Sequence, residues 1–184
     1  MRIERPLMRA IGILSILAIL ISASGLTASS ARKETNGALP PTQPAQTSKQ
    51  ADLAIIVNKS NPTDNISYSE LREYFLAERS HWVNGGGKVR IVMRAPGQPE
   101  REAVLHLIYN MNEKGFTSYF LGKKFTGEVL EEPRQQNSTP DVIKFISYIP
   151  GAIGYVRADE IDASVKVLRV DGLTPGEPGY KIKL

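Results

Sequence analysis

Arg94 and the loop that follows it are the residues best suited to chemistry. Residues 89–94 alternate in polarity and are rich in β-branched side chains, so we predict a strand that ends at Met93 or Arg94. Prolines and a glycine then stop the strand, and Pro99 suits the first position of a helix with Gln98 as its cap. A guanidinium group beside the free N–H groups of a helix N-terminus can hold an anion. We therefore predict an anion-binding site at this strand-to-helix turn.

The same arginine has a structural alternative. Strand-to-helix turns of this kind occur in many α/β domains, and Arg94 could instead pair with Glu100 or Glu102 on the surface. The residues alone leave both interpretations open.

Other catalytic and metal-binding patterns are weak in this sequence. His81 and His106 are the only histidines and there is no cysteine, so a metal site would also need carboxylates. Glu102 lies four residues before His106, but two ligands do not complete a site, and an exposed pair is the simpler interpretation. No Gly-x-Ser-x-Gly nucleophile motif occurs. We therefore predict that the protein is not an enzyme and that it binds no metal or cofactor.

Four extended segments are expected besides the strand before Arg94. They are residues 53–57, 152–156, 165–170 and 180–184. The first is almost wholly apolar, which predicts a strand buried on both faces of a sheet. Because helices are predicted between the strands, the fold class is α/β, with a small mixed sheet flanked by helices.

Two of the helices have clear N-terminal signals. Ser67 and Glu70 form a capping box for a helix that begins at Tyr68. Ser138 or Thr139 caps another helix, which has Pro140 at its first position.

The helix that begins at Pro99 should bury one stripe of apolar residues, spaced by three and four positions. The stripe consists of Ala103, Val104, Leu107, Ile108 and Met111. We expect Lys114 and Gly115 to end this element, and a further short helix at residues 116–121.

The first 51 residues are expected to lie outside the folded domain. Residues 1–31 contain arginines, an apolar run and then small residues, the pattern of an export signal peptide, with an uncleaved membrane anchor as the minority alternative. Residues 32–51 are rich in Pro, Thr, Gln, Ser and Ala, which is typical of a flexible linker. We therefore expect a domain at residues 52–184 in the periplasm or elsewhere outside the cytoplasm.

The net charge gives no indication of nucleic-acid binding. Residues 1–31 carry three arginines and one glutamate, so their removal lowers the formal net charge from +4 to +2. This charge is mild and no basic stripe with interleaved aromatic residues is present.

Several stretches of the chain resemble the phosphate-binding components of ABC transporters, in the type-two periplasmic binding protein superfamily. These stretches are residues 56–62 (IVNKSNP), 67–82, 94–103, 150–156 (PGAIGYV), 167–172 and 175–180. Together they cover nearly all of residues 53–184, and their shared order is more specific than any one of them. The resemblance implies about one lobe of such a binding protein, with phosphate or a similar oxyanion as its ligand.

The resemblance also implies which residues face the oxyanion. Arg94 and the loop into the following helix would face it directly, with Ser138 and Thr139 as a weaker candidate wall. The expected ligand-binding residues are Arg94, Gly97 and Gln98 through their amides, Ser60, Ser138 and Thr139.

Two functions from different classes remain open. The first is an exported oxyanion-binding protein linked to ABC phosphate uptake, with an ABC permease or another periplasmic or membrane protein as partner. The second is a periplasmic adaptor or sensor-partner module that keeps the fold but has lost ligand binding. Arg94 and the helix start at Thr139 favour the first. The second is favoured by the single lobe and by the sequence of residues 96–99 (PGQP), where the family usually has a Gly-Ser-Gly-Thr type loop.

One lobe leaves a ligand half exposed, whereas tight pockets bury most of the ligand surface. A partner protein, or a second copy in a homodimer, would therefore complete the cleft.

Overall fold

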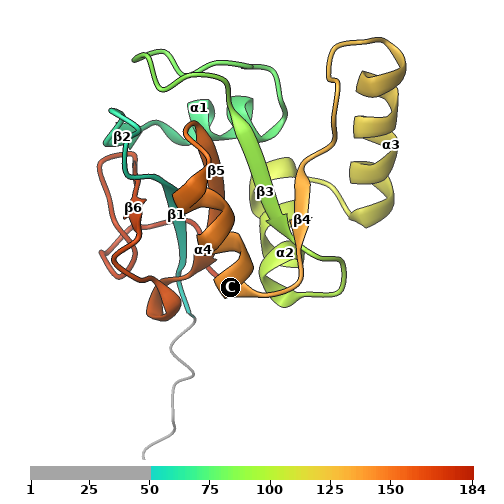
Figure 1. The fold of residues 1–184 in the computed structure, drawn as a ribbon. Helices are drawn as coiled ribbons and strands as arrows, with labels where there is room; N and C mark the ends of the chain where they lie inside the picture. Colours follow the sequence, from blue (N-terminus) through green and yellow to red (C-terminus); the bar gives the residue numbers. More distant parts are fainter. Residues whose placement is uncertain (1–50) are drawn as a thin grey trace, which may run out of the picture. The chain divides into compact units, whose positions relative to one another are not determined.

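Strands and helices alternate along the chain, as expected for an α/β fold (Figure 1). The computed structural model describes residues 51–184; the predicted export signal and nearly all of the predicted linker lie outside this range. The strands are β1 (Leu53–Asn58), β2 (Asn65–Ile66), β3 (Arg90–Arg94), β4 (Arg134–Gln136), β5 (Ala152–Arg157), β6 (Val165–Val167) and β7 (Arg169–Val170). The helices are α1 (Tyr68–Phe75), α2 (Pro99–Val104), the π-helix η1 (Leu105–Tyr109), α3 (Glu113–Phe125), α4 (Thr139–Tyr148) and the short 3-10 helix η2 (Ala158–Glu160).

The main sheet has five strands in the order β4-β3-β5-β1-β6. Strand β3 is parallel to both β4 and β5, whereas β1 is antiparallel to β5 and β6. A separate two-stranded sheet pairs β2 with β7. The predicted small mixed sheet with flanking helices is therefore confirmed.

Both faces of the main sheet are covered. Leu53 and Ile55 of β1 belong to the apolar cluster that includes side chains of α1, η1 and α3, while Ala54 and Ile56 belong to the cluster beneath α4. All six residues of β1 are buried, which confirms the strand predicted to be buried on both faces.

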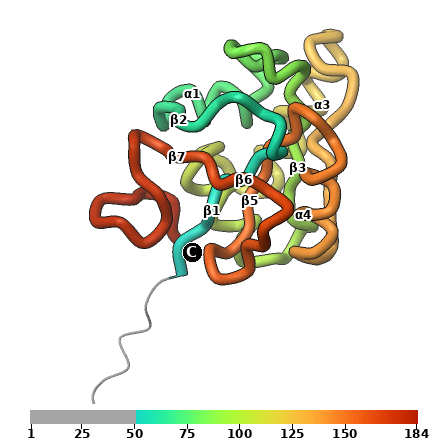
Figure 2. The backbone as a smooth tube through the Cα atoms, turned by 60° about the vertical axis from the view of Figure 1, so that its left-hand side comes forward, coloured from blue at the N-terminus to red at the C-terminus, as the bar shows by residue number. Residues whose placement is uncertain are grey.

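The end of the chain lies against the start of the domain. Figure 2 shows β6 beside β1, and the backbone N–H of Leu53 donates to the carbonyl of Ile182 at 2.9 Å. The N–H of Leu184 donates to the carbonyl of Ala51 at 2.8 Å. The predicted extended piece at 180–184 thus bonds to the first residue of β1 and to the residues just before it, although it makes only an isolated bridge rather than a strand.

The helix after Pro99 differs from its prediction in two ways: it ends as a π-helix, and it buries a neighbouring stripe of residues. Residues 105–109 form a π-helix, yet the buried positions 101, 104, 105, 108 and 109 still follow the spacing of an amphipathic α-helix. Leu105 and Tyr109 are buried beside Val104 and Ile108, whereas the other members of the predicted stripe are only partly buried.

The predicted helix end at Lys114 and Gly115 was wrong. The preceding helix already ends at Asn110, which adopts a left-handed conformation with φ 55°. Lys114 and Gly115 lie in the first turn of α3, where the Gly115 N–H donates to the side chain of Asn112 at 2.8 Å. The short helix expected at 116–121 is the middle of this longer one.

The structure also differs from the sequence prediction at two strands. The segment predicted as one strand at 165–170 divides at Leu168, whose N–H donates to the carbonyl of Ile55 at 2.8 Å before the chain leaves the main sheet. Strand β4 was not predicted, because its three residues are polar and it pairs only with β3 at the edge of the sheet.

The predicted capping box of α1 is confirmed and allows a test. The Glu70 N–H donates to the Ser67 hydroxyl at 3.1 Å. The Ser67 N–H and hydroxyl donate to the Glu70 carboxylate at 2.9 and 3.0 Å, and these two bonds lower the pKa of Glu70. We expect Ser67→Ala to lower the free energy of unfolding by about 1 kcal/mol in urea titrations. Ser69→Ala, at an exposed position of the same helix, should change it by less than about 0.5 kcal/mol.

Within residues 51–184, none of the helices has both the length and the apolar character needed to span a bilayer. The same residues contain no group of three or more histidine, aspartate or glutamate side chains arranged to hold a metal ion.

Candidate anion-binding site

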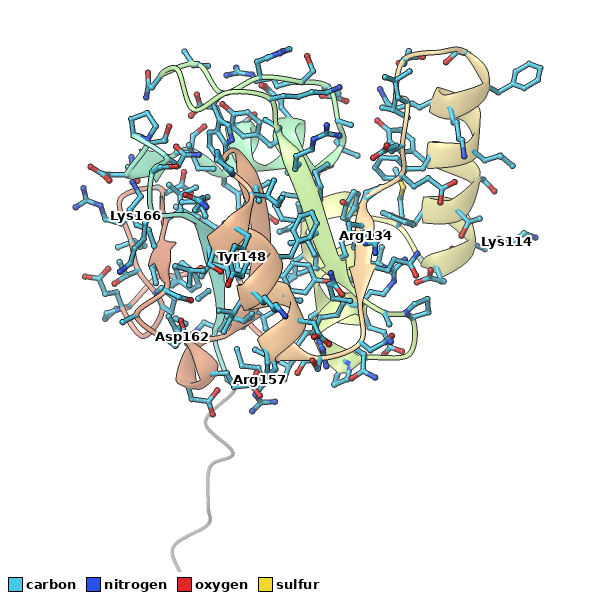
Figure 3. All side chains as sticks on the ribbon, in the orientation of Figure 1. Lys114, Arg134, Tyr148, Arg157, Asp162 and Lys166 are labelled. Carbon is cyan, nitrogen blue, oxygen red and sulfur yellow. The ribbon has the colours of Figure 1, made fainter. Side chains whose placement is uncertain are left out.

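The sheet brings three strand ends to one edge. Because β3, β4 and β5 are parallel, their last residues Arg94, Gln136 and Arg157 lie at the same edge, which we call the carboxyl edge. Helices α2 and α4 both begin at this edge, after short loops from β3 and β4 (Figure 1). Figure 3 shows Arg157 at this end of the sheet and Lys166 at the other.

Arg94 is almost fully buried at the carboxyl edge, with an exposed fraction of 8%. Its backbone N–H donates to the hydroxyl of Tyr155 at 3.2 Å, and its Nη2 donates to Oε1 of Gln98 at 3.1 Å. Burial raises the pKa of Tyr155, so that hydroxyl stays neutral at physiological pH. The Nε and Nη1 atoms of Arg94 make no hydrogen bond to any of residues 51–184. Buried donors of this kind are costly unless they find a partner.

A second arginine holds the backbone of Arg94 in place. Arg101 has an exposed fraction of only 1%, and its Nη1 donates to the carbonyl of Arg94 at 2.9 Å. Its Nε and Nη2 each donate to the Glu113 carboxylate at 2.8 Å, which lowers the pKa of Glu113. The guanidinium also lies over the ring of Phe116, 4.8 Å from the centroid. Arg101 therefore ties α2, α3 and the end of β3 together.

Glu100 lies between two arginines. Its Oε2 is 3.9 Å from Nε of Arg94, and its Oε1 is 3.9 Å from Nη1 of Arg157. The alternative interpretation of Arg94 thus has support, since it pairs with Glu100, but the pair is buried rather than on the surface. Glu102 is exposed and forms no ion pair within residues 51–184.

The start of α4 contributes two hydroxyl groups near the same edge. Ser138 is the N-cap residue, and its hydroxyl accepts from the N–H of Asp141 at 3.3 Å. Thr139 is buried, and its Oγ1 donates to Oε2 of Glu160 at 2.8 Å. Both hydroxyls already have protein partners.

The loop between β3 and α2 is open to solvent. Gly97 is exposed and has a φ of 80°, with no atom within 4 Å of the position that a Cβ would take. Gln98 caps α2 without a side-chain bond to the helix, because its side chain bonds to Arg94 instead. The structure therefore brings these two residues close to Arg94, as predicted.

Ser60 does not join the other predicted residues. It follows the end of β1, and β1 runs antiparallel to β5, so Ser60 lies at the edge opposite Arg94. Its N–H and hydroxyl both donate to Oδ1 of Asn58, at 2.9 and 2.7 Å. It acts as a local turn residue of β1.

The roles of Arg157, Arg101 and Glu160 were not predicted from sequence. Arg157 had one usable signal, because it directly follows a predicted strand just as Arg94 ends one. Arg101 and Glu160 had none, since their contacts come from elements distant in sequence.

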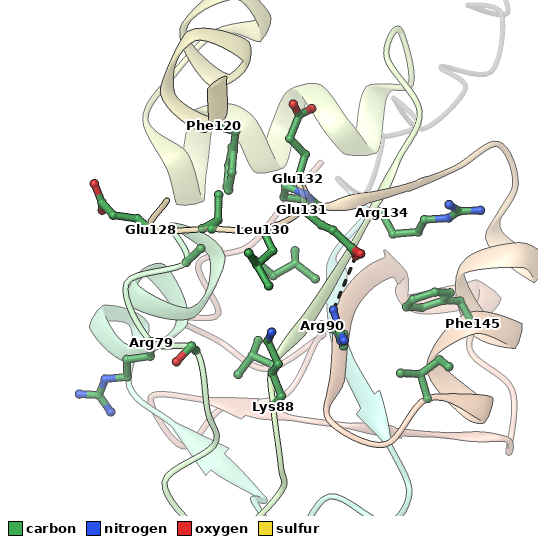
Figure 4. Close-up of a pocket in the computed structure, with 17 residues that line it drawn as sticks. Arg79, Lys88, Arg90, Phe120, Glu128, Leu130, Glu131, Glu132, Arg134 and Phe145 are labelled. Carbon is green, nitrogen blue, oxygen red and sulfur yellow. Dashed lines mark ion pairs between the residues drawn. The ribbon is translucent and has the colours of Figure 1, made fainter. Parts of the chain in front are cut away.

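A cavity of about 520 Å³ lies away from these residues, at the starts of β3 and β4 (Figure 4). Apolar side chains including Ile91, Phe120 and Leu130 line it, together with an ion pair of Arg90 and Glu131 at 3.6 Å. Four strand positions separate Arg90 from Arg94, a distance of about 13 Å. The cavity and the carboxyl edge are therefore separate features.

The chain is similar to a curated relative in sequence. It is 27% identical over 124 residues to the phosphate-binding protein PstS of Bacillus subtilis, a match that covers 67% of this chain and 37% of that protein. No protein-family profile matches the chain.

Solved structures show the same fold. An ABC-type phosphate transport receptor from Vibrio cholerae matches with a TM-score of 0.55 and 21% identity, over 68% of this chain and 48% of that one. PstS from Borrelia burgdorferi matches with a TM-score of 0.52 and 19% identity, over 68% of this chain and 49% of that one. The chain spans less than half the length of these proteins. It is therefore similar in sequence and fold to one part of the phosphate-binding proteins of ABC transporters, as its motifs predicted.

Proposed function

We propose that this protein binds phosphate or a similar oxyanion at the carboxyl edge and takes part in ABC phosphate uptake. The observation that supports this most is the buried guanidinium of Arg94, at the edge where two helices begin. Two of its nitrogens, Nε and Nη1, form no hydrogen bond within residues 51–184. In open α/β sheets, ligands bind outside the carboxyl ends of the parallel strands. The relatives that are named for phosphate binding support the choice of ligand.

In this proposal Arg94 supplies the positive charge, and the amides of Gly97 and Gln98 supply neutral donors. Ser138 and Thr139 form the neighbouring wall, and their hydroxyls reach the ligand only if they exchange their present carboxylate partners. Ser60 is left out of the site because it lies at the opposite edge.

In this proposal residues 51–184 supply only one side of the ligand site. Phosphate held on one side keeps much of its hydration, and burial strengthens charge-assisted bonds. We propose that an ABC permease, another extracytoplasmic protein or a second copy of the chain supplies the other side.

We also propose that residues 1–31 act as an export signal and residues 32–51 as a linker. Residues 52–184 then form a binding domain outside the cytoplasm. The domain binds its ligand without chemical conversion, in keeping with relatives that are named as binding proteins and receptors.

A second candidate function is an extracytoplasmic adaptor that has kept the fold but lost the ligand. The position of Glu100 favours it, because a buried carboxylate already faces Arg94 and Arg157. In this case the carboxyl edge would be a protein contact surface.

Calorimetric titration with phosphate and then sulfate separates the two functions. We expect saturable phosphate binding that Arg94→Ala weakens about 100-fold, because each charge-assisted hydrogen bond contributes about 1.5–3 kcal/mol. Arg90→Ala is the matched control, since Arg90 is an exposed arginine of the same strand, and it should bind like the wild type. Phosphate binding that Arg94→Ala leaves unchanged would contradict the proposed site, and no heat at millimolar phosphate would favour the adaptor.

A further inference from the structure

Glu100 is placed where a bound oxyanion would be expected. It is the second residue of α2 and has an exposed fraction of 7%. Its two carboxylate oxygens face different guanidinium groups, Arg94 at the end of β3 and Arg157 at the end of β5. A negatively charged group with two oxygens thus lies between two cations at the carboxyl edge.

The Glu100 carboxylate balances the charge of the two arginines but forms no hydrogen bond with either of them. Both Glu100–arginine distances are 3.9 Å, which is an ion pair but too long for a hydrogen bond. The Oε2 of Glu100 and the Nε and Nη1 of Arg94 are all buried and form no hydrogen bond within residues 51–184. A phosphate ion has more acceptor oxygens and no side-chain tether, so it can form the bonds that the Glu100 carboxylate leaves unmade.

An oxyanion and the Glu100 carboxylate cannot both occupy this position. Two negative charges within about 4 Å repel each other strongly in a buried environment. We propose that Glu100 is an internal anion that occupies the oxyanion position, so that an external oxyanion binds only when the Glu100 carboxylate is displaced. The inference rests on the proposed function, and it makes Glu100 the residue that limits affinity.

The exposed loop before Glu100 would allow its carboxylate to move away from the two arginines. Pro96, Gly97 and Pro99 are exposed, and no atom lies within 4 Å of the position that a Cβ at Gly97 would take. Displacement therefore requires movement at an open turn rather than in the apolar core, and a partner at the carboxyl edge could favour it.

The test is phosphate titration calorimetry on four forms of the purified full-length protein: the wild type, Glu100→Gln, Glu102→Gln and the double variant Arg94→Ala with Glu100→Gln. Glu102→Gln is the matched control, because it makes the same charge change at an exposed site on the same helix. We expect Glu100→Gln to bind phosphate at least tenfold more tightly than the wild type. Glu102→Gln should bind like the wild type. The double variant should not show the increased phosphate affinity of Glu100→Gln.

Thermal unfolding provides a second readout. Glu100→Gln leaves Arg94 and Arg157 without this counter-charge, so its melting temperature should fall in phosphate-free buffer and rise with added phosphate by more than that of the wild type. If Glu100→Gln is unfolded without phosphate, refolding is followed by circular dichroism. Refolding at millimolar phosphate supports the internal anion, and failure to refold overturns it.

The outcomes distinguish this inference from the proposed function. If the wild type binds phosphate through Arg94 but Glu100→Gln binds no more tightly, the internal anion is overturned and the proposed function stands. An equal gain in Glu102→Gln also overturns it, because the effect is then one of net charge. If folded wild type and folded Glu100→Gln both fail to bind, both ideas are overturned.

Discussion

Replacing Gly151 with alanine should lower the free energy of unfolding by about 3 kcal/mol or more. Gly151 has a φ of 79°, which costs an L-residue about 1–2 kcal/mol, and a Cβ there would lie 2.3 Å from the carbonyl oxygen of Lys88. The same glycine accepts hydrogen bonds from the indole N–H of Trp82 at 2.9 Å and from the N–H of Arg90 at 3.1 Å. An alanine would therefore disturb the start of β3 as well as its own turn.

Gly172→Ala is the matched control for this prediction. Gly172 has nearly the same φ, 82°, but no atom lies within 4 Å of the position that a Cβ would take. Its substitution should cost only the conformational strain, about 1 kcal/mol. Urea titrations of both variants check the difference. Equal losses in the free energy of unfolding would show that the close approach of Lys88 to Gly151 does not add to the cost of an alanine there.

Removing Glu113 should destabilise the protein more than removing Arg101. Arg101 is 1% exposed, whereas the Glu113 side chain is 46% exposed. Glu113→Ala leaves a buried positive charge without its partner, and such losses are typically about 3–5 kcal/mol. Arg101→Met leaves a carboxylate that water can solvate and costs about 1–2 kcal/mol, chiefly through the lost bond to the Arg94 carbonyl. Equal losses in the two variants would contradict this asymmetry.

The same pair predicts a pH dependence of stability. The hydrogen bond from Arg101 lowers the pKa of Glu113 below its ordinary value of 4.5. The ionised form is therefore favoured in the folded state, so the stabilisation is present above the ordinary pKa and is lost as the pH falls through the lowered pKa. Between pH 7 and pH 3, Glu113→Gln should lose less stability than the wild type, as measured by urea unfolding at both values.

Local signals made much of the fold predictable. The capping box of α1, the helix start at Pro99 and the apolar run of β1 depend on neighbours in sequence, and each occurs where it was predicted. The helix predicted to start at Pro140 begins one residue earlier, at Thr139, with Ser138 as its cap. The buried face of the helix after Pro99 was placed wrongly, because the predicted residues 103, 104, 107, 108 and 111 and the buried residues 104, 105, 108 and 109 both have helical spacing. Strand β4 is polar and relies on its pairing with β3, which leaves no periodic pattern.

The candidate site was predictable only in part, for the same reason. Arg94, Gly97 and Gln98 lie on one continuous segment, so their proximity followed from sequence. The direction of β1 relative to β3 decides the place of Ser60, and no local pattern encodes that direction. The contacts of Glu100 with Arg157 likewise depend on the parallel arrangement of β3 and β5.

The most direct test of oxyanion binding at the carboxyl edge is a crystal structure of the protein with tungstate, a tetrahedral oxyanion with strong anomalous scattering. We predict an anomalous peak within hydrogen-bond distance of Nε or Nη1 of Arg94, with the Glu100 carboxylate moved away from its present position. A peak only in the 520 Å³ cavity near Arg90, or an unchanged Arg94–Glu100 pair at saturating tungstate, would contradict this prediction.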